Sequence, residues 1–194
     1  PRTIGVACNL HEAESPQNLG PETLVLDGVA QAEDQLGESY HLASYGSFVQ
    51  AHRVQAARVH ALILQEMAAI DPADGGRPRI LDCYGGSGAI SLSLARAKHR
   101  VTLVESFGPA AANARSAAQA QGIETIVRTG YVADVSASLV AAGEKFDAIV
   151  VNPPRRGVSP VAREALARLG APLILYVSCD PQPLARDISR AGTR

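Results

Sequence analysis

Residues 80–88 read Ile-Leu-Asp-Cys-Tyr-Gly-Gly-Ser-Gly, and the rest of the chain is organised around this stretch. It begins as a short apolar run, which predicts a buried strand over residues 79–82. Gly85, Gly86 and Gly88 follow directly. Because glycine has no side chain, these positions allow the backbone to turn tightly and to approach a ligand closely.

The residues after this glycine turn complete a known order of elements. Residues 89–97 carry apolar side chains among small ones and predict a helix, and residues 100–104 predict a second strand that ends in the acidic Glu105. Strand, glycine turn, helix, strand and acid is the order of a nucleotide-binding βαβ unit, in which the carboxylate accepts hydrogen bonds from ribose hydroxyls. The sequence therefore predicts a cofactor of nucleoside type.

Strands and helices continue to alternate after Glu105. The predicted strands cover residues 125–128, 146–151 and 173–177, and the predicted helices cover residues 53–69, 109–121, 132–142 and 160–169, with a last helix opening after residues 178–181. This alternation predicts an α/β fold with a doubly wound, Rossmann-like parallel sheet and helices on both faces. The strand over residues 173–177 would be an outer strand, although its apolar sequence is typical of a buried one.

The first 45 residues differ in composition from the rest. Residues 3–45 are rich in Gly, Pro, Asn and Glu, and they predict a small β-hairpin layer or lid with turns at residues 18–20 and 27–28. We therefore divide the chain into a partial β-rich subdomain over residues 1–45 and an α/β domain over residues 46–194. Because the chain begins without an initiator Met or a signal peptide, we expect it to be a fragment of a longer protein.

Composition narrows the class of protein. With 194 residues, of which 46% are hydrophobic, the chain can bury a substantial core, and its apolar runs are too short to span a bilayer. The net charge of −1 gives no global reason to bind nucleic acid. An RNA-binding protein of this kind would need local Arg residues or a separate basic module.

The chain has three cysteines, Cys8, Cys83 and Cys179, and their wide spacing matches no pattern of metal ligands. We expect reduced thiols in a cytoplasmic protein, without a disulfide, a metal or an iron–sulfur cluster. A single cysteine is most often a buried small hydrophobe, and we expect this of Cys8 and Cys83. Cys179 differs because it follows a predicted strand and precedes Asp180-Pro181, a helix start whose dipole favours a thiolate.

A second polar position follows the strand over residues 146–151. Asn152 is succeeded by Pro153 and Pro154, which fix the backbone and remove two donors. Ligands of an open parallel sheet bind outside the carboxyl ends of its strands. We therefore expect the Asn152 amide to face the same cleft as the glycine turn and Cys179, where it can present a donor and an acceptor to a base.

Three motifs resemble those of a known enzyme family. Residues 82–88, residues 146–157 (Phe-Asp-Ala-Ile-Val-Val-Asn-Pro-Pro-Arg-Arg-Gly) and residues 176–187 (Tyr-Val-Ser-Cys-Asp-Pro-Gln-Pro-Leu-Ala-Arg-Asp) are similar to the motifs of the S-adenosylmethionine-dependent RNA uracil-C5 methyltransferases. Residues 47–50, Ser-Phe-Val-Gln, match the Ser-Phe-x-Gln segment of that family. The Ser-Cys-Asp-Pro form resembles the ribosomal RNA lineage more than the transfer RNA lineage.

The resemblance implies a class I methyltransferase fold, S-adenosylmethionine as cofactor and an RNA substrate, with ribosomal RNA favoured. It implies that Cys179 is the nucleophile and that Asn152 is catalytic and, with Arg155 and Arg156, holds the substrate. The residues implied to contact the cofactor are Gln50, Asp82, Gly85, Gly86, Gly88, Glu105 and Asn152. Uracil C5 is a poor nucleophile until a thiolate adds at C6, which explains why the reaction needs a cysteine.

The chain departs from the family at three points. The family often has Asp where this chain has Asn152. It tends to have Gly-Asp or Ala-Asp where this chain has Gly130-Tyr131, so the contact to the adenine amino group changes and Asp134 becomes a substitute. The family's general base is a Glu downstream of the cysteine helix, and we therefore expect this domain to be truncated at its C-terminal end.

Other functions remain as alternatives. An amino-methyltransferase also uses Asn-Pro-Pro after its fourth strand, but it normally continues with an aromatic residue rather than Arg155 and needs no Cys179. A nicotinamide-dependent oxidoreductase would favour a Gly-x-Gly-x-x-Gly turn. A non-catalytic remnant that only binds the cofactor is the last alternative.

Overall fold

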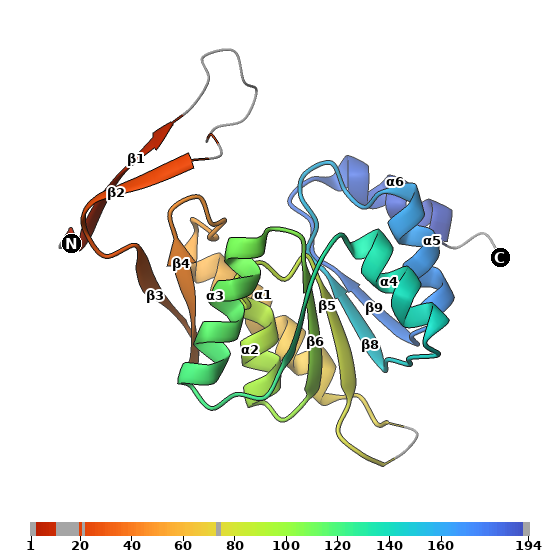
Figure 1. Ribbon diagram of the computed structural model, residues 1–194. Helices are drawn as coiled ribbons and strands as arrows, with labels where there is room; N and C mark the ends of the chain where they lie inside the picture. Colours follow the sequence, from red (N-terminus) through yellow and green to blue (C-terminus); the bar gives the residue numbers. More distant parts are fainter. Residues whose placement is uncertain (1–2, 11–19, 21, 73–74, 192–194) are drawn as a thin grey trace.

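The computed structural model describes residues 3–10, 20, 22–72 and 75–191. Its centre is a five-stranded parallel sheet with the order β7-β6-β5-β8-β9 (Figure 1). The strands are β5 (Arg79–Cys83), β6 (Arg100–Glu105), β7 (Ile126–Thr129), β8 (Ala148–Val151) and β9 (Leu173–Tyr176). The α/β fold with a doubly wound parallel sheet is therefore confirmed.

Six helices accompany the strands in the described part of the chain: α1 (Arg53–Ala68), α2 (Ala89–Arg96), α3 (Gly108–Ala120), α4 (Val132–Ala141), α5 (Pro160–Leu169) and α6 (Pro181–Ala191). Side chains alternate between the two faces along each strand. Ile149 and Val151 of β8 pack in one cluster with residues of α4 and α5, whereas Ala148 and Val150 pack in another with residues of α1 and α2. Helices therefore cover both faces of the sheet.

The ends of α5 show how local sequence sets an element's limits. Ser159 caps the helix by accepting a hydrogen bond from the Ala162 N–H at 3.3 Å, and Pro160 occupies the first turn, where its missing N–H costs nothing. At the other end Gly170 has a φ of +64°, the left-handed conformation that stops a helix. This places β9 three residues later, beside β8.

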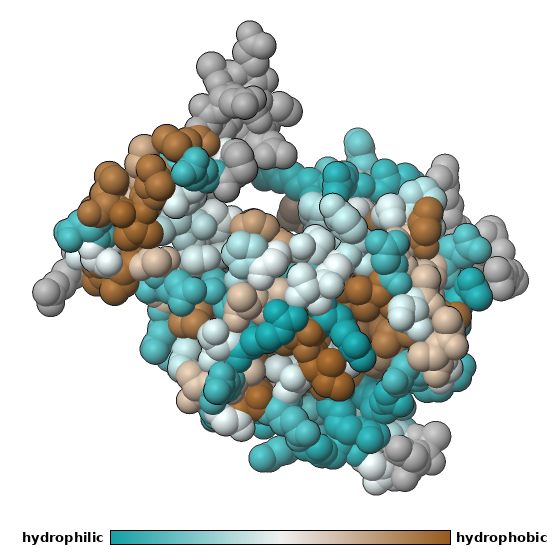
Figure 2. Space-filling view, in the orientation of Figure 1, coloured by the Kyte–Doolittle hydropathy of each residue, from teal (hydrophilic) through white to brown (hydrophobic). Residues whose placement is uncertain are grey.

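The N-terminal part forms two separate antiparallel pairs, β1 (Gly5–Leu10) with β2 (Glu22–Gly28), and β3 (Gln31–Leu36) with β4 (Ser39–Ser44). Tyr40 and Leu42 of β4 pack against Leu92 and Ala117 of α2 and α3. The β1–β2 pair extends away from the α/β body (Figure 1), and its surface carries a large share of exposed apolar side chains (Figure 2).

Two predictions in this region were wrong. No turn occurs at residues 27–28, because Gly28 pairs with Gly5 inside the β1–β2 ladder; a Cβ at Gly28 would lie 2.2 Å from the Ile4 carbonyl oxygen, so glycine permits a close backbone approach there. The actual two-residue hairpin turn joins Leu36 to Ser39. Cys8 is exposed rather than buried, because β1 lies in a two-stranded ribbon with one open face. Of the turn predicted at residues 18–20, residues 18 and 19 lie outside the described residues.

The position of β9 agrees with the sequence. Within the described residues it is the outer strand next to β8, and its Ile174 side chain is 46% exposed. The inward-facing Leu173 and Leu175 pack only partly against the α1–α2 side of the core. Among the described residues, β9 is therefore an apolar strand whose second hydrogen-bonding edge has no neighbouring strand.

Candidate cofactor and nucleophile site

The glycine turn begins at Tyr84, whose φ of +61° is unusual for a residue with a side chain. The Gly85 N–H donates to the Val104 carbonyl at 3.1 Å, and the Gly88 N–H donates to the Gly85 carbonyl at 2.9 Å. A Cβ at Gly85 would lie 2.5 Å from Cγ of the buried Leu103, so the turn requires glycine there. The turn therefore packs closely against β6 at the carboxyl end of the sheet.

The opposite side of this turn is open. Gly86 has a φ of +56°, and no atom lies within 4 Å of the position that a Cβ would take there. Its N–H donates to Oε2 of Glu105 at 3.0 Å, and the Phe107 N–H donates to Oε1 at 2.6 Å. Oε1 also accepts from the Ser106 hydroxyl at 3.4 Å. Glu105 is therefore fixed in place, and Oε2 can still accept a second hydrogen bond from a hydroxyl group.

Asp82 is fully buried beneath the turn. Its Oδ2 accepts a hydrogen bond from the Ser91 hydroxyl at 2.6 Å, and its Oδ1 has no partner within the described residues. Burial, opposed by the Ser91 hydrogen bonds and reinforced by the nearby charge of Glu105, raises the pKa of Asp82 to about 7. An unpaired oxygen this deeply buried is an acceptor that a ligand's donor, or water, can satisfy.

Gln50 lies in the segment between β4 and α1. It is exposed, and within the described residues it makes no hydrogen bond with the glycine turn. The neighbouring Ser47 is anchored to Ser44 through their hydroxyls at 2.9 Å, while the Phe48 side chain is 78% exposed. The structure thus brings Asp82, Glu105 and the glycines together but does not join Gln50 to them.

Asn152 follows the last residue of β8. Cys83 pairs with Val151 across the parallel ladder, and the Asn152 N–H donates to the Cys83 carbonyl at 3.3 Å. The half-buried Asn152 is therefore level with the start of the glycine turn. Its side-chain amide makes no hydrogen bond to the described residues, so both its donors and its acceptor remain available.

Cys179 follows β9, the next strand in the sheet. The Val177 N–H donates to the Val151 carbonyl at 2.8 Å, which continues the ladder to the level of Asn152. Cys179 is exposed, and Asp180 begins α6 by accepting from the Gln182 N–H at 2.9 Å, as the Asp-Pro pattern predicted. Cys83, by contrast, is buried as expected, and burial raises the pKa of its thiol well above the usual range.

A carboxylate that the sequence did not single out connects the Asn152 loop to the Cys179 helix. Asp187 of α6 is 3% exposed. It accepts hydrogen bonds from the Val158 N–H at 2.7 Å, the Tyr176 hydroxyl at 2.8 Å, Arg163 at 2.5 Å and Arg186 at 3.0 Å. Burial alone would raise the pKa of Asp187, but these donors lower it to about 2.

Other site residues predicted from the sequence lie on the surface at either side of the glycine turn. Arg155 and Arg156 are exposed in the loop after Asn152, and the carbonyl of Arg156 accepts from Arg186 at 2.7 Å. Tyr131 follows β7, the strand at the opposite edge of the sheet, and it is 70% exposed at the start of α4. Asp134, the acid expected to replace the usual adenine contact, is exposed in the first turn of that helix. The two arginines therefore border the Cys179 side, and Tyr131 borders the Glu105 side.

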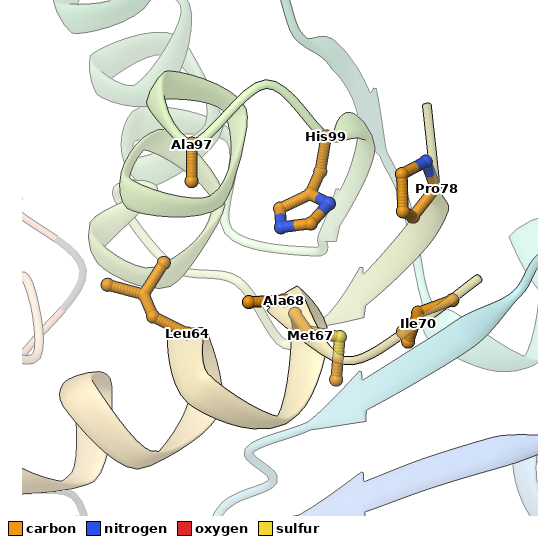
Figure 3. Close-up of a pocket in the computed structure, with 7 residues that line it drawn as sticks. All are labelled: Leu64, Met67, Ala68, Ile70, Pro78, Ala97 and His99. Carbon is orange, nitrogen blue, oxygen red and sulfur yellow. The ribbon is translucent and has the colours of Figure 1, made fainter. Parts of the chain in front are cut away.

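A cavity of about 470 Å³ lies elsewhere in the molecule. It is lined by Leu64, Met67, Ala68, Ile70, Pro78, Ala97 and His99 (Figure 3). Pro78 and His99 directly precede β5 and β6, so this cavity is at the amino ends of the strands, opposite the glycine turn. Among the described residues, no group of three or more metal-ligating side chains occurs and no helix is long and apolar enough to cross a membrane.

The sheet order, the glycine turn after β5 and the acid at the end of β6 are those of a doubly wound nucleotide-binding sheet, and the fold is that of the class I methyltransferases. Two solved structures share it. The tRNA (uracil-54, C5)-methyltransferase of Pyrococcus abyssi, in complex with S-adenosyl-L-homocysteine, has a TM-score of 0.77 at 24% identity and covers 97% of this chain and 44% of its own. A SAM-dependent methyltransferase of Agrobacterium tumefaciens has a TM-score of 0.63 at 16% identity, covering 95% and 64%.

Residues 56–175 match the family described as Conserved hypothetical protein 95, and the chain belongs to that family. A protein of Lactiplantibacillus plantarum named an uncharacterized RNA methyltransferase is 32% identical over 195 residues, which is 98% of this chain and 41% of the relative. The chain thus spans about two fifths of the length of this relative. The cofactor expected from the sequence agrees with the S-adenosyl-L-homocysteine bound in the Pyrococcus structure.

Proposed function

We propose that this chain is the cofactor-binding and catalytic part of an S-adenosylmethionine-dependent RNA methyltransferase that methylates C5 of a uridine through Cys179. One observation carries the proposal. The glycine turn, Asn152 and Cys179 follow three adjacent strands, β5, β8 and β9, whose carboxyl ends are in register. A nucleoside cofactor, a base-reading amide and a thiol would therefore meet at one edge of the sheet.

The residues around the turn suit S-adenosylmethionine. Above Gly86 there is space for a ligand to approach the backbone, and a side chain at Gly85 would displace the turn. The unpaired oxygen of Asp82 and the remaining lone pair of Glu105 Oε2 are acceptors, and the cofactor's ammonium and ribose hydroxyls are donors. When bound, the cofactor supplies a methyl group on a sulfonium.

The chain's own groups then account for the activation of uracil. The Cys179 thiolate adds to C6, so a C–S bond forms and the π electron pair of the C5–C6 double bond is displaced into an enolate that spans C5, C4 and O4. The Asn152 amide can donate to this developing charge. C5 then takes the methyl group as the bond between that methyl group and the sulfonium breaks. A base removes the C5 proton, the C5–C6 double bond re-forms, and the C–S bond to Cys179 breaks to return the thiolate. The resemblance implies that this base lies downstream of α6.

The cationic surface beside Cys179 supports an RNA substrate. Arg155 and Arg156 are exposed within three residues of Pro153, where phosphates of a bound strand could be neutralised. The chain as a whole carries a net charge of −1, so its net charge does not attract RNA and the two arginines have to supply the local positive charge. We favour ribosomal RNA over transfer RNA on the basis of the Ser-Cys-Asp-Pro form.

A mechanism-based trap tests the proposal. The complete protein is incubated with S-adenosylmethionine and RNA containing 5-fluorouridine, whose C5 has no proton to lose. We expect a covalent protein–RNA species that survives denaturant. It should form in the Cys83→Ala variant and be absent in Cys179→Ala. If Cys179→Ala keeps full methylation of ordinary RNA and no adduct forms with any variant, an amino-methyltransferase replaces our proposal.

A calorimetric titration tests the cofactor half separately. S-adenosyl-L-homocysteine should bind the complete protein, and Glu105→Ala should weaken that binding by about tenfold, because a charged acceptor of ribose hydroxyls is lost. Unchanged affinity in Glu105→Ala would remove Glu105 from the site. Tighter binding of NAD than of S-adenosyl-L-homocysteine would favour the oxidoreductase alternative.

A further inference from the structure

A chain of polar side chains, buried at Ser87 and His41, leads from the glycine turn to the β3–β4 hairpin. The Ser87 hydroxyl lies 2.6 Å from Nδ1 of His41, and Nε2 of His41 lies 2.8 Å from Oδ2 of Asp34. Arg53, the first residue of α1, pairs with both oxygens of Asp34, at 2.6 and 2.7 Å. Ser87 and His41 are only 4% and 3% exposed, so water cannot replace these contacts freely.

The direction of each hydrogen bond follows from the partners. Arg53 holds Asp34 as a carboxylate, which can only accept, so Nε2 of His41 carries a proton and donates to it. Burial lowers the pKa of His41 in spite of Asp34, which leaves the ring neutral at neutral pH. Nδ1 is then an acceptor, and the Ser87 hydroxyl donates to it.

Ser87 is a special position within the turn. Residues 85, 86 and 88 are glycines, so Ser87 is the single side chain of residues 85–88 by which the rest of the protein can hold this segment. Glycine-rich backbone has many conformations available and loses more entropy than other backbone when a ligand fixes it. A side-chain bond at Ser87 reduces that loss in advance.

The hairpin that carries His41 is itself firmly attached. Asn113 of α3 donates to the Leu42 carbonyl at 3.2 Å and to the Ser44 hydroxyl at 3.0 Å. Ser39 and Ser93 of α2 lie 2.9 Å apart through their hydroxyls. His41 is therefore presented from a fixed support rather than from a loose strand.

We propose that His41 and Asp34 are positioning residues that hold the cofactor turn through Ser87, so that the β3–β4 hairpin forms part of the cofactor site. This inference rests on the proposed function, because it assigns the turn to S-adenosylmethionine. It also gives the hairpin a role beyond that of a lid. The signal in the sequence is slight, namely a polar His41 at an inward position of a strand.

Two substitutions of His41 separate the two bonds. In His41→Asn the amide oxygen can take the place of Nδ1 and accept from Ser87, whereas in His41→Gln the amide nitrogen can take the place of Nε2 and donate to Asp34. Both remove a ring from the same buried site, so we expect similar losses of melting temperature. They differ in which neighbour they keep.

Calorimetry with S-adenosyl-L-homocysteine on the complete protein is the measurement. We expect His41→Gln and Ser87→Ala to weaken binding by about tenfold each and His41→Asn to stay within about threefold of the parent. In the double variant Ser87→Ala/His41→Gln, the loss should equal that of either single variant, because both break the same bond. If a His41 variant folds poorly, Ser87→Ala alone keeps the test decisive, because it removes the same bond and leaves the ring in place; unchanged affinity in Ser87→Ala would overturn the inference.

The outcomes separate this inference from the proposed function. If the parent protein does not bind S-adenosyl-L-homocysteine, the proposed function fails first. If the parent binds but His41→Asn and His41→Gln lose affinity equally, or the double variant shows additive losses, His41 acts only on stability and the inference is overturned.

Discussion

The glycine turn on β5 and the Cys179 segment after β9 belong to the same edge of the sheet but are held in different ways. The turn is fixed by β6, because the Gly85 N–H donates to the Val104 carbonyl and the Gly86 N–H donates to the Glu105 carboxylate. The Cys179 segment depends on one buried carboxylate, Asp187, which gathers donors from the preceding loop, β9, α5 and α6.

The difference reflects what the glycine turn and the Cys179 segment each have to bind. A cofactor has a constant shape, so a turn whose geometry is set by close packing is sufficient to bind it. The proposed function requires the Cys179 thiol and the Asn152 amide to be aligned with each other across two strands, and this alignment requires contacts between segments far apart in the chain. Changes that damage one side should therefore leave a different signature from changes that damage the other.

The largest effect is expected at Gly85. Its substitution by Ala puts a Cβ about 2.5 Å from Leu103 Cγ, inside a core that cannot yield, so Gly85→Ala should lower the free energy of unfolding by about 3 kcal/mol. Urea denaturation measures this. Gly86→Ala is the matched control, because nothing surrounds its Cβ and only the φ of +56° is strained, at about 1 kcal/mol. Equal losses in the two variants would contradict close packing of the turn.

Asp187→Asn tests the other side. Because the folded pKa of about 2 lies below the ordinary value of 3.8, the ionised carboxylate contributes about 2 kcal/mol of stability that is present above pH 4 and is lost as the pH falls toward 2. We expect Asp187→Asn to lower stability by about this amount at pH 7, and the difference from the parent to shrink below pH 4. A difference that stays constant from pH 7 to 3 would show that the charge of Asp187 is not what holds the loop.

His60 of α1, near His41 and Arg53, gives a smaller effect. Burial, with His41 and Arg53 nearby, lowers the pKa of His60 from 6.5 to about 4, and its Nδ1 has no partner within the described residues. The unfolded chain binds the extra proton between these values, so stability should fall as the pH drops from 6.5 to 4, by about 1 to 2 kcal/mol at pH 5.

The comparison is made between the parent and His60→Gln at each pH. Asp82, whose pKa is raised to about 7, titrates in the same range with the opposite effect on stability, but it is present in both proteins. Parallel stability curves for the two proteins from pH 7 to 5 would show that His60 is not buried in its neutral form.

Much of the α/β body could be predicted because local patterns determine it. Buried parallel strands are short apolar runs, and each predicted strand and helix agrees with the structure to within about two residues. The tips that bear Asn152 and Cys179 follow from the same alternation, because all strands of a parallel sheet end on one side.

The rest depends on contacts between distant residues. Asp187 reads as one more acid on an amphipathic helix, and its burial arises only because Gly157, Arg163 and Tyr176 surround it. Ser87 and His41 are 46 residues apart. The prediction that Cys8 is buried was wrong because it rested on the general tendency of single cysteines to be buried, whereas Cys8 lies on the exposed face of β1.

The three thiols give the smallest but simplest test. In the native protein Cys8 and Cys179 are exposed and should react with a disulfide reagent within minutes, whereas Cys83 is buried with a raised pKa and should react only on unfolding. Counting reacted thiols in the parent and in Cys8→Ser distinguishes them. Rapid reaction of all three thiols in the native state would mean that the carboxyl end of β5 unfolds locally and exposes Cys83.

The identity of the methylated nucleoside tests the central claim most directly. The complete protein is given S-adenosylmethionine with a labelled methyl group and unmodified ribosomal or transfer RNA, and the RNA is digested to nucleosides for mass spectrometry. Our account predicts label in 5-methyluridine, lost in Cys179→Ala. Label on an amino nitrogen of adenosine or guanosine, unaffected by Cys179→Ala, would contradict it.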